Sequence, residues 1–155
     1  MLHDLINTIM DAEGFSETPY WDNKQWTWGY GTKFSNALTK DAEISPMYRI
    51  SKSEAKKELC VNLAEAMENY MLIFESVTNR ISVPRRYALI EMLYNLGLTS
   101  FLTFQNMLKE LISPNQNIDW NKVALEAKDS KWYHQVGKRG ERIVEVLKTG
   151  GKYEK

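Results

Sequence analysis

The chain has 155 residues, of which 43% are hydrophobic and 26% are charged. This length suits one domain with a substantial core, and the composition excludes a disordered chain. The apolar runs are too short to cross a bilayer, and no basic segment precedes an apolar stretch at the N-terminus, so membrane insertion and a secretory leader are not expected. One cysteine and two histidines make a disulfide framework or a zinc motif unexpected, and no metal or organic cofactor is predicted.

The formal net charge is zero, but the charges are unevenly distributed. Residues 120–155 contain nine Lys or Arg and five Asp or Glu. Such a basic segment suits an anionic polymer as partner. On charge alone, however, an ordinary solvated helical surface is the preferred interpretation.

The first predicted elements are an amphipathic helix and a small sheet. Residues 2–12 space their apolar side chains as one helix face, and Gly14 suits the position after the helix end. Segments 20–22 and 26–30 are short and aromatic on either side of a polar turn, which predicts a β-hairpin. The polar stretch that follows is expected to be mostly loop, with a short third strand near residues 48–50.

Helices are predicted for the remainder of the chain. Ser51 and Glu54 have the spacing of a capping box at the start of a long helix. Pro84 suits the first turn of the next helix, which is expected to stop at Gly97. Three further helices are expected over residues 102–112, 119–129 and 139–148. A helix, then a small sheet, then many helices is an order typical of an α+β fold with the sheet confined to one lobe.

We therefore expect a single domain over residues 1–155, built of two lobes. The small antiparallel β-sheet lobe would cover about residues 14–50. The larger α-helical lobe would comprise residues 1–13 and about 51–155. The long helix that begins near Ser51 would join them, and a polymer would bind in a cleft between the lobes.

Glu13 is the first candidate for chemistry. It lies at the C-terminal end of the first predicted helix, eleven residues after Leu2 and near the same helix face. Partial burial and the negative end of the helix dipole both favour a protonated carboxylic acid, the form that a proton donor needs. From position alone, a helix-end glutamate that bends into solvent is the preferred alternative.

Asp22 and Thr27 bracket the predicted hairpin turn. If the loop is 23–26, they are directly opposed, with Cβ atoms about 5 Å apart. A carboxylate beside a hydroxyl can hold one water molecule between them. Turn chemistry for the aspartate and strand preference for the threonine explain the same residues without a function.

In combination, these residues resemble the catalytic stretch of the T4-type phage lysozymes, glycoside hydrolase family 24. Eight residues separate Glu13 from Asp22, as in that family. The resemblance extends over nearly the whole chain. The matching segments are Glu13-Gly14, Tyr20-x-Asp22, Trp26-Thr27-Trp28-Gly29-Tyr30-Gly31, residues 84–92, Phe104-x-Asn106, Ser130-Lys131-Trp132-Tyr133-x-Gln135, Arg139, Arg142 and Lys148-Thr149-Gly150.

The resemblance implies a lysozyme-like fold and a muramidase that hydrolyses the β-1,4 bond between N-acetylmuramic acid and N-acetylglucosamine with inversion. It implies that Glu13 is the general acid and that Asp22 and Thr27 position or activate the attacking water. Arg139 would pair with Glu13. Because a nearby cation favours the ionised carboxylate, it opposes burial and the helix dipole, and the net preference stays open.

The sugar-binding positions of the family fall on four residues, with Asn95 beside the second of them. These four positions are Lys33, Tyr94, Met107 and Glu126. Tyr94 keeps an aromatic ring suited to stacking on a sugar. Met107 and Glu126 differ from the family residues, so a core side chain and a solvated helix face are their alternatives.

Three departures from the family pattern stand out. Four residues separate Asp22 from Thr27 where the family has five, so the turn is one residue tighter. Thr32 stands where the family has a histidine, and we expect altered stability there rather than lost chemistry. The stretch 32–50 is also shorter than in the family, so a short helix of the small lobe is expected to be missing.

The resemblance also implies a biological role as an endolysin that lyses bacterial cells. A monomer that binds peptidoglycan strands and no nucleic acid is expected, in the host cytoplasm before release to the wall or carried in a virion. Two alternatives are a non-catalytic wall-binding module and a lytic transglycosylase. The joint presence of Glu13, Asp22 and Thr27 argues against the first, and the water-handling pair argues against the second.

Overall fold

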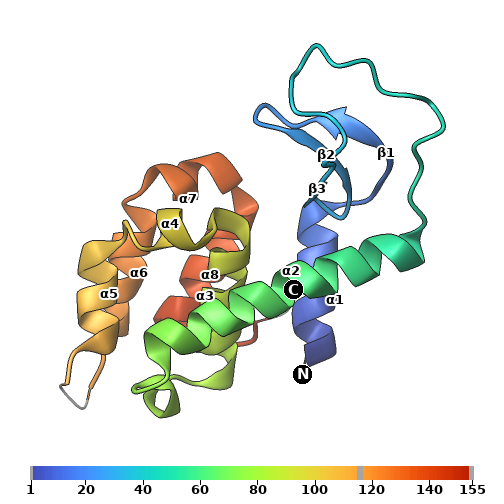
Figure 1. The fold of residues 1–155 in the computed structure, drawn as a ribbon. Helices are drawn as coiled ribbons and strands as arrows, with labels where there is room; N and C mark the ends of the chain where they lie inside the picture. The colour runs from blue at the N-terminus through green and yellow to red at the C-terminus, as the bar shows by residue number, and fades with distance from the viewer. Residues whose placement is uncertain (1, 115–116, 154–155) are drawn as a thin grey trace. The chain divides into compact units, whose positions relative to one another are not determined.

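The computed structural model describes residues 2–114 and 117–153. A three-stranded antiparallel sheet follows the first helix, and helices form most of what comes after it (Figure 1). The predicted α+β class is confirmed. In chain order the elements are α1 (Leu2–Glu13), β1 (Ser16–Trp21), β2 (Trp26–Gly29), β3 (Thr32–Lys33), α2 (Lys52–Phe74), a 3-10 helix η1 (Thr78–Arg80), α3 (Val83–Leu96), α4 (Leu98–Phe101), α5 (Gln105–Ile112), α6 (Trp120–Lys128), α7 (Lys131–Val136) and α8 (Lys138–Thr149). None of the described helices has the length and apolar character needed to cross a bilayer.

The chain divides into two compact units. The sheet unit comprises residues 6–64, and the helical unit comprises residues 1–5 and 65–155. The sheet unit is larger than the expected 14–50 because it also includes most of α1 and the first half of α2. Both helices therefore contribute residues to each unit.

The first helix forms as its sequence pattern predicts. Leu5, Ile6 and Ile9 of its apolar stripe are buried, whereas Leu2 at the start of the helix is 48% exposed. Gly14 follows the last helical residue with a φ of 70°, and its N–H donates to the carbonyl of Met10 at 3.0 Å. Glycine adopts this left-handed conformation without a steric penalty, which is why the helix ends directly after Glu13.

The hairpin register differs from the predicted one. Thr27 on β2 is opposed by Tyr20 on β1, not by Asp22, and Trp21 is opposed by Trp26. Asp22 lies outside the strand, in a turn closed by its own N–H donating to the carbonyl of Gln25 at 3.0 Å. The expected Asp22–Thr27 strand pair is therefore wrong, because the turn spans 22–25 rather than 23–26.

The third strand is also not where it was expected. It follows the hairpin directly, as β3, and pairs Lys33 with Thr27 and Thr32 with Trp28. Residues 48–50 form no strand, although Ile50 donates one backbone hydrogen bond to the carbonyl of Glu17 at 2.9 Å. Between β3 and α2, residues 34–51 form turns and bends without a helix, in agreement with the shortened loop.

The two faces of the sheet carry different side chains. Successive residues of a strand point to opposite faces, so Trp26 and Trp28 lie on the face opposite Thr27. The ring of Trp26 lies 6.0 Å from that of Trp21, and the ring of Trp28 lies 5.0 Å from that of Phe34. The tryptophans of the hairpin therefore pack with other aromatic side chains and leave the Thr27 face to polar groups.

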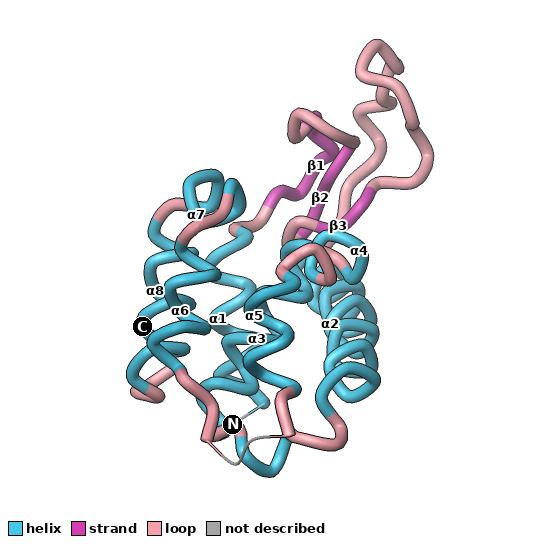
Figure 2. Tube along the Cα trace, turned by 90° about the vertical axis from the view of Figure 1, so that its left-hand side faces the viewer, coloured by secondary structure: helices cyan, strands magenta, loops and turns pink. Residues whose placement is uncertain are grey.

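Within the helical unit, α8 packs against α3 and α6, and α5 packs against α6 (Figure 2). Asp119 caps α6 by accepting from the N–H of Lys122 at 3.1 Å, and Gly97 ends α3. The predicted helix 102–112 is wrong at its start, because a turn separates α4 from α5, and α7 was not predicted at all. The fully buried core side chains of this unit include Phe74, Leu89, Met92, Phe101, Met107, Leu111, Ile143 and Leu147.

Candidate active site

Glu13 ends α1 with a half-buried side chain. Its carboxylate lies directly over Gly31, in the turn between β2 and β3, so closely that a Cβ atom at Gly31 would overlap it. Gly31 also has a φ of 77°, a conformation that other residues rarely adopt. Glycine at this position therefore lets the backbone of the sheet approach the carboxylate.

Asp22 and Thr27 do meet, although they are not opposed in the sheet. The side chain of Asp22 turns back over the hairpin, and its Oδ2 accepts a hydrogen bond from the Thr27 hydroxyl at 2.8 Å. Its Oδ1 accepts from the backbone N–H of Lys24 at 3.0 Å and of Gln25 at 2.9 Å. The turn thus holds the carboxylate in place, and Thr27, only 2% exposed, is held by its strand.

These contacts determine the charge of Asp22. Partial burial opposes ionisation, but the hydrogen bonds donated by Gln25, Lys24 and Thr27 outweigh it and lower the pKa of Asp22 below its usual value. Asp22 is therefore a carboxylate at neutral pH. A carboxylate of this kind can accept a proton from water but cannot serve as a proton donor.

Tyr20 belongs to the same group of side chains. It is the strand partner of Thr27 and is 41% exposed. Partial burial raises the pKa of its phenol, and the negative charges of Asp22 and Glu13 raise it further. The phenol therefore remains protonated in the field of both carboxylates. From the sequence, Tyr20 was part of a matching motif without a role of its own, because only Asp22 and Thr27 were expected to face each other.

Lys33, a predicted sugar contact, lies on the other side of Thr27. It is exposed on β3 and is the strand partner of Thr27 on that side. The sheet unit thus brings together Glu13, Asp22, Thr27 and Lys33, all predicted from the sequence, with Tyr20 as an addition. The remaining predicted site residues lie in the helical unit.

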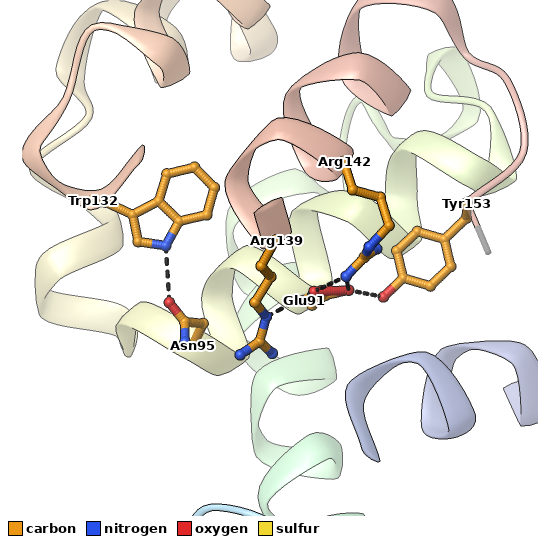
Figure 3. A network of polar contacts seen from close by, with 6 residues as sticks. All are labelled: Glu91, Asn95, Trp132, Arg139, Arg142 and Tyr153. Atoms are coloured by element: carbon orange, nitrogen blue, oxygen red, sulfur yellow. Dashed lines mark hydrogen bonds and ion pairs between the residues drawn. The ribbon is translucent and has the colours of Figure 1, made fainter. Parts of the chain in front are cut away.

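Arg139, the predicted partner of Glu13, takes part in a buried ionic network around Glu91 (Figure 3). Its Nε lies 2.9 Å from Oε2 of Glu91, and Nη2 of Arg142 lies 2.8 Å and 2.6 Å from the two carboxylate oxygens. The Tyr153 hydroxyl donates to the same carboxylate. Glu91 was not predicted as a network residue, since it lies among the apolar residues of α3. The pairing of Arg139 with Glu13 stays a prediction.

Glu91 is fully buried yet ionised. Burial opposes its charge, but the hydrogen bond from Arg142, the positive charges of Arg139 and Arg142, and the bond from Tyr153 together lower its pKa. Two guanidinium groups thus share one buried carboxylate within the helical unit.

The other predicted sugar contacts differ in how far their side chains are exposed to solvent. The side-chain carbonyl of Asn95 accepts a hydrogen bond from Trp132 Nε1 at 2.8 Å, as Figure 3 shows, and Tyr94 beside it is half-buried. Met107 has no exposed surface, as its alternative as a core residue predicts, yet it contributes to the lining of the pocket that Glu126 also lines. Glu126 is half-buried at a pocket of about 320 Å³ that Ser130 also lines. The sugar-binding roles of these residues stay predictions.

Comparison with known proteins identifies the family of the chain. The family model of phage lysozyme matches residues 10–147. Probable T4-type lysozymes 1 and 2 of Dictyostelium discoideum are each 31% identical to the chain, over 76% and 72% of its length. The pre-baseplate central spike protein Gp5 of Enterobacteria phage T4 is 26% identical over 89% of it. The chain spans 67%, 61% and 26% of the lengths of these three relatives. The chain therefore belongs to the phage lysozyme family, as its resemblance to the T4-type enzymes predicted.

Proposed function

We propose that the chain is a muramidase that hydrolyses the β-1,4 bond between N-acetylmuramic acid and N-acetylglucosamine in peptidoglycan. The observation that carries this proposal is the hydrogen bond between Thr27 and the ionised carboxylate of Asp22, on the sheet that also approaches the Glu13 carboxylate. The arrangement supplies two carboxyl groups on one compact unit, and glycoside hydrolysis uses such a pair.

In the proposed reaction, Glu13 donates its proton to the glycosidic oxygen as the bond from that oxygen to the muramic C1 breaks. Water attacks C1 from the opposite face, and Asp22 accepts the proton that this water loses. One sugar leaves with a free hydroxyl, and the other gains a hydroxyl at C1 with inverted configuration. Inversion requires carboxyl groups about 6.5–9.5 Å apart, so that a water molecule fits between Asp22 and the sugar.

Arg139 is proposed to pair with Glu13 and favour the carboxylate left after proton donation. Lys33, exposed beside Thr27, is proposed as a sugar contact on the sheet. Tyr94, Asn95 and Glu126 are proposed as contacts from the helical unit.

The biological role that we propose is lysis of the bacterial wall by a monomeric enzyme. As an endolysin, it would accumulate in the cytoplasm of the host and reach the wall after a separate protein breaches the membrane. The similarity to a central spike protein of a phage particle supports a virion-carried enzyme as the alternative. The assay measures lysis of whole bacterial cells by added enzyme, with intact and with permeabilised membranes. An endolysin that acts from the cytoplasm should require permeabilisation, whereas a virion-carried enzyme that acts on the outer side of the wall should not.

Product analysis tests the chemistry directly. Purified peptidoglycan is incubated with the wild type, with Glu13→Gln and with Asp22→Asn, and the soluble muropeptides are identified by mass spectrometry. We expect reducing muramic ends from the wild type and essentially none from either variant. Glu17→Gln is the matched control, because Glu17 is an exposed glutamate of the same unit whose partner is the exposed Arg49.

Two other results would overturn the proposal. Anhydromuramic ends from the wild type would assign the chain to the lytic transglycosylases, in which a sugar hydroxyl replaces water. Sedimentation with the wall without release of any product would indicate a non-catalytic binding module.

A further inference from the structure

We propose that Tyr20 is a positioning residue, whose hydroxyl donates a hydrogen bond to the attacking water held at Thr27 and Asp22. This inference rests on the proposed muramidase reaction and adds a third group to the water site. It arises from the observed strand register, in which Tyr20 occupies the position expected for Asp22.

Three side chains form one row across the sheet. Thr27 is the strand partner of Tyr20 on one side and of Lys33 on the other. Directly opposed residues of antiparallel strands project from the same face, about 5 Å apart at Cβ. Thr27 itself is 2% exposed, whereas Tyr20 is 41% exposed and Lys33 is exposed as well. The row therefore has a recessed hydroxyl between two longer side chains that reach solvent.

The Thr27 and Asp22 side chains offer a bound water only hydrogen-bond acceptors. The proton of the Thr27 hydroxyl is committed to Asp22, so Thr27 can only accept from a water molecule. Asp22, as a carboxylate, can also only accept. A water at this position donates both of its protons to the protein, and a donor directed at its oxygen is needed to fix its orientation.

Tyr20 meets this requirement as a neutral group. In the part of the chain that the structure describes, its hydroxyl makes no direct protein hydrogen bond, so its proton is available to water or substrate. Burial and the charges of Asp22 and Glu13 raise the pKa of the phenol, so it remains a donor wherever the two carboxyl groups are active.

The test compares Tyr20→Phe with Tyr48→Phe, using the wild type as reference. Tyr48 is the matched control, because it is a 38% exposed tyrosine of the same unit that packs on Phe34. We measure kcat and KM on purified peptidoglycan, the proportion of anhydromuramic ends among the products, and the free energy of unfolding in urea.

We expect Tyr20→Phe to lower kcat by about 3- to 10-fold, as the loss of one hydrogen bond in the transition state predicts, with KM changed less than about twofold. A sugar hydroxyl then competes better with the loosely held water, so the share of anhydromuramic ends should rise. Tyr48→Phe should match the wild type in all three measurements, and both variants should unfold at the wild-type urea concentration.

A Tyr20→Phe enzyme with wild-type kcat overturns the inference. So does a lower kcat that comes with a lower free energy of unfolding, or without any rise in anhydromuramic ends, because a purely structural role explains both results. If the wild type itself releases no muramic ends, the muramidase proposal fails and the role of Tyr20 fails with it. An active wild type with an equally active Tyr20→Phe variant leaves the muramidase proposal intact.

Discussion

The carboxylate of Glu13 occupies the space that a Cβ atom at Gly31 would fill. The contact joins the last residue of α1 to the turn between β2 and β3, two segments of one compact unit. The position of the proposed acid therefore depends on a glycine that contributes no functional group of its own.

Substitution of this glycine should affect activity more than stability. Gly31→Ala must displace the Glu13 carboxylate, and a misplacement of about 1 Å can cost about 100-fold in kcat. Gly97→Ala is the matched control, because its φ of 79° is similar and a Cβ atom there meets nothing within 4 Å. Both variants should lose about 1–3 kcal/mol of unfolding free energy, because alanine is strained at a positive φ. Wild-type kcat in Gly31→Ala would contradict the positioning of Glu13 by this contact.

The contribution of the Thr27 hydroxyl to activity should be separable from the contribution of the side chain's shape. Thr27→Val keeps the branched side chain in its buried position but cannot donate to Asp22 or accept from water. We expect kcat to fall by about 100-fold or more, in the range measured for groups that act on a transferred proton. Thr27→Ser, which restores the hydroxyl, should recover most of the loss. Equal activity of the serine and valine variants would show that the hydroxyl has no part in the reaction.

The buried network around Glu91 should contribute strongly to the stability of the fold. Glu91→Gln leaves the guanidinium groups of Arg139 and Arg142 without the carboxylate, and breaking a buried ion pair costs about 3–5 kcal/mol. Glu17→Gln, which removes an exposed pair with Arg49, should cost less than about 1 kcal/mol. Urea unfolding at neutral pH measures the loss of unfolding free energy in both variants. Similar losses in the two variants would contradict the importance of burial.

The same network should make stability depend on pH. The pKa of Glu91 is lowered in the folded chain from its ordinary value of 4.5. A carboxyl group of this kind stabilises the fold above that value and loses its contribution as the pH falls through the folded-state pKa. The unfolding free energy of the wild type should therefore decrease below about pH 4.5 more steeply than that of Glu91→Gln. Parallel pH profiles would assign the acid sensitivity to other carboxylates.

Thr32 should contribute to stability without contributing to catalysis. Its hydroxyl donates to Oε2 of Glu58 at 2.6 Å and connects β3 to α2, at the position where the family has a histidine. Thr32→Val should reduce the unfolding free energy by about 1.5–3 kcal/mol, as expected for a hydrogen bond to a charged group. The value of kcat at a temperature where both proteins are folded should not change. A large loss of kcat would instead give Thr32 a role at the site.

The sequence was most informative where one residue determines a local geometry. Gly14 and Gly97 end helices because of their backbone conformation, and Asp119 begins one because its carboxylate caps the first turn. The short helices α4 and α7 were missed because each has too few residues to show a periodic apolar face. In α7 a capping signal was nevertheless present, because the Ser130 hydroxyl accepts a hydrogen bond from the N–H of Tyr133.

The candidate site likewise has residues that the sequence predicted and a geometry that it did not. Glu13, Asp22 and Thr27 could be proposed because their order and spacing match a known family. The register between the strands could not be predicted from the sequence. It depends on the Asp22 carboxylate, which accepts hydrogen bonds from two backbone N–H groups, so that the turn begins one residue earlier than expected. A positive φ of 82° at Asn23 completes that turn, and asparagine is one of the few residues that adopt it readily.

The alternation of the sheet restricts how this protein can change by insertion or deletion. Gaining or losing one residue in the turn 22–25 would slide β1 against β2 and exchange the polar face of Thr27 for the face of Trp26 and Trp28. An insertion or deletion in this hairpin preserves the two faces only if a second irregularity restores the register. The register already shifts once, between Ser16 and Tyr20. We therefore expect natural variants with longer or shorter turns to carry a compensating bulge in β1, so that the two parts of the hairpin evolve as a pair.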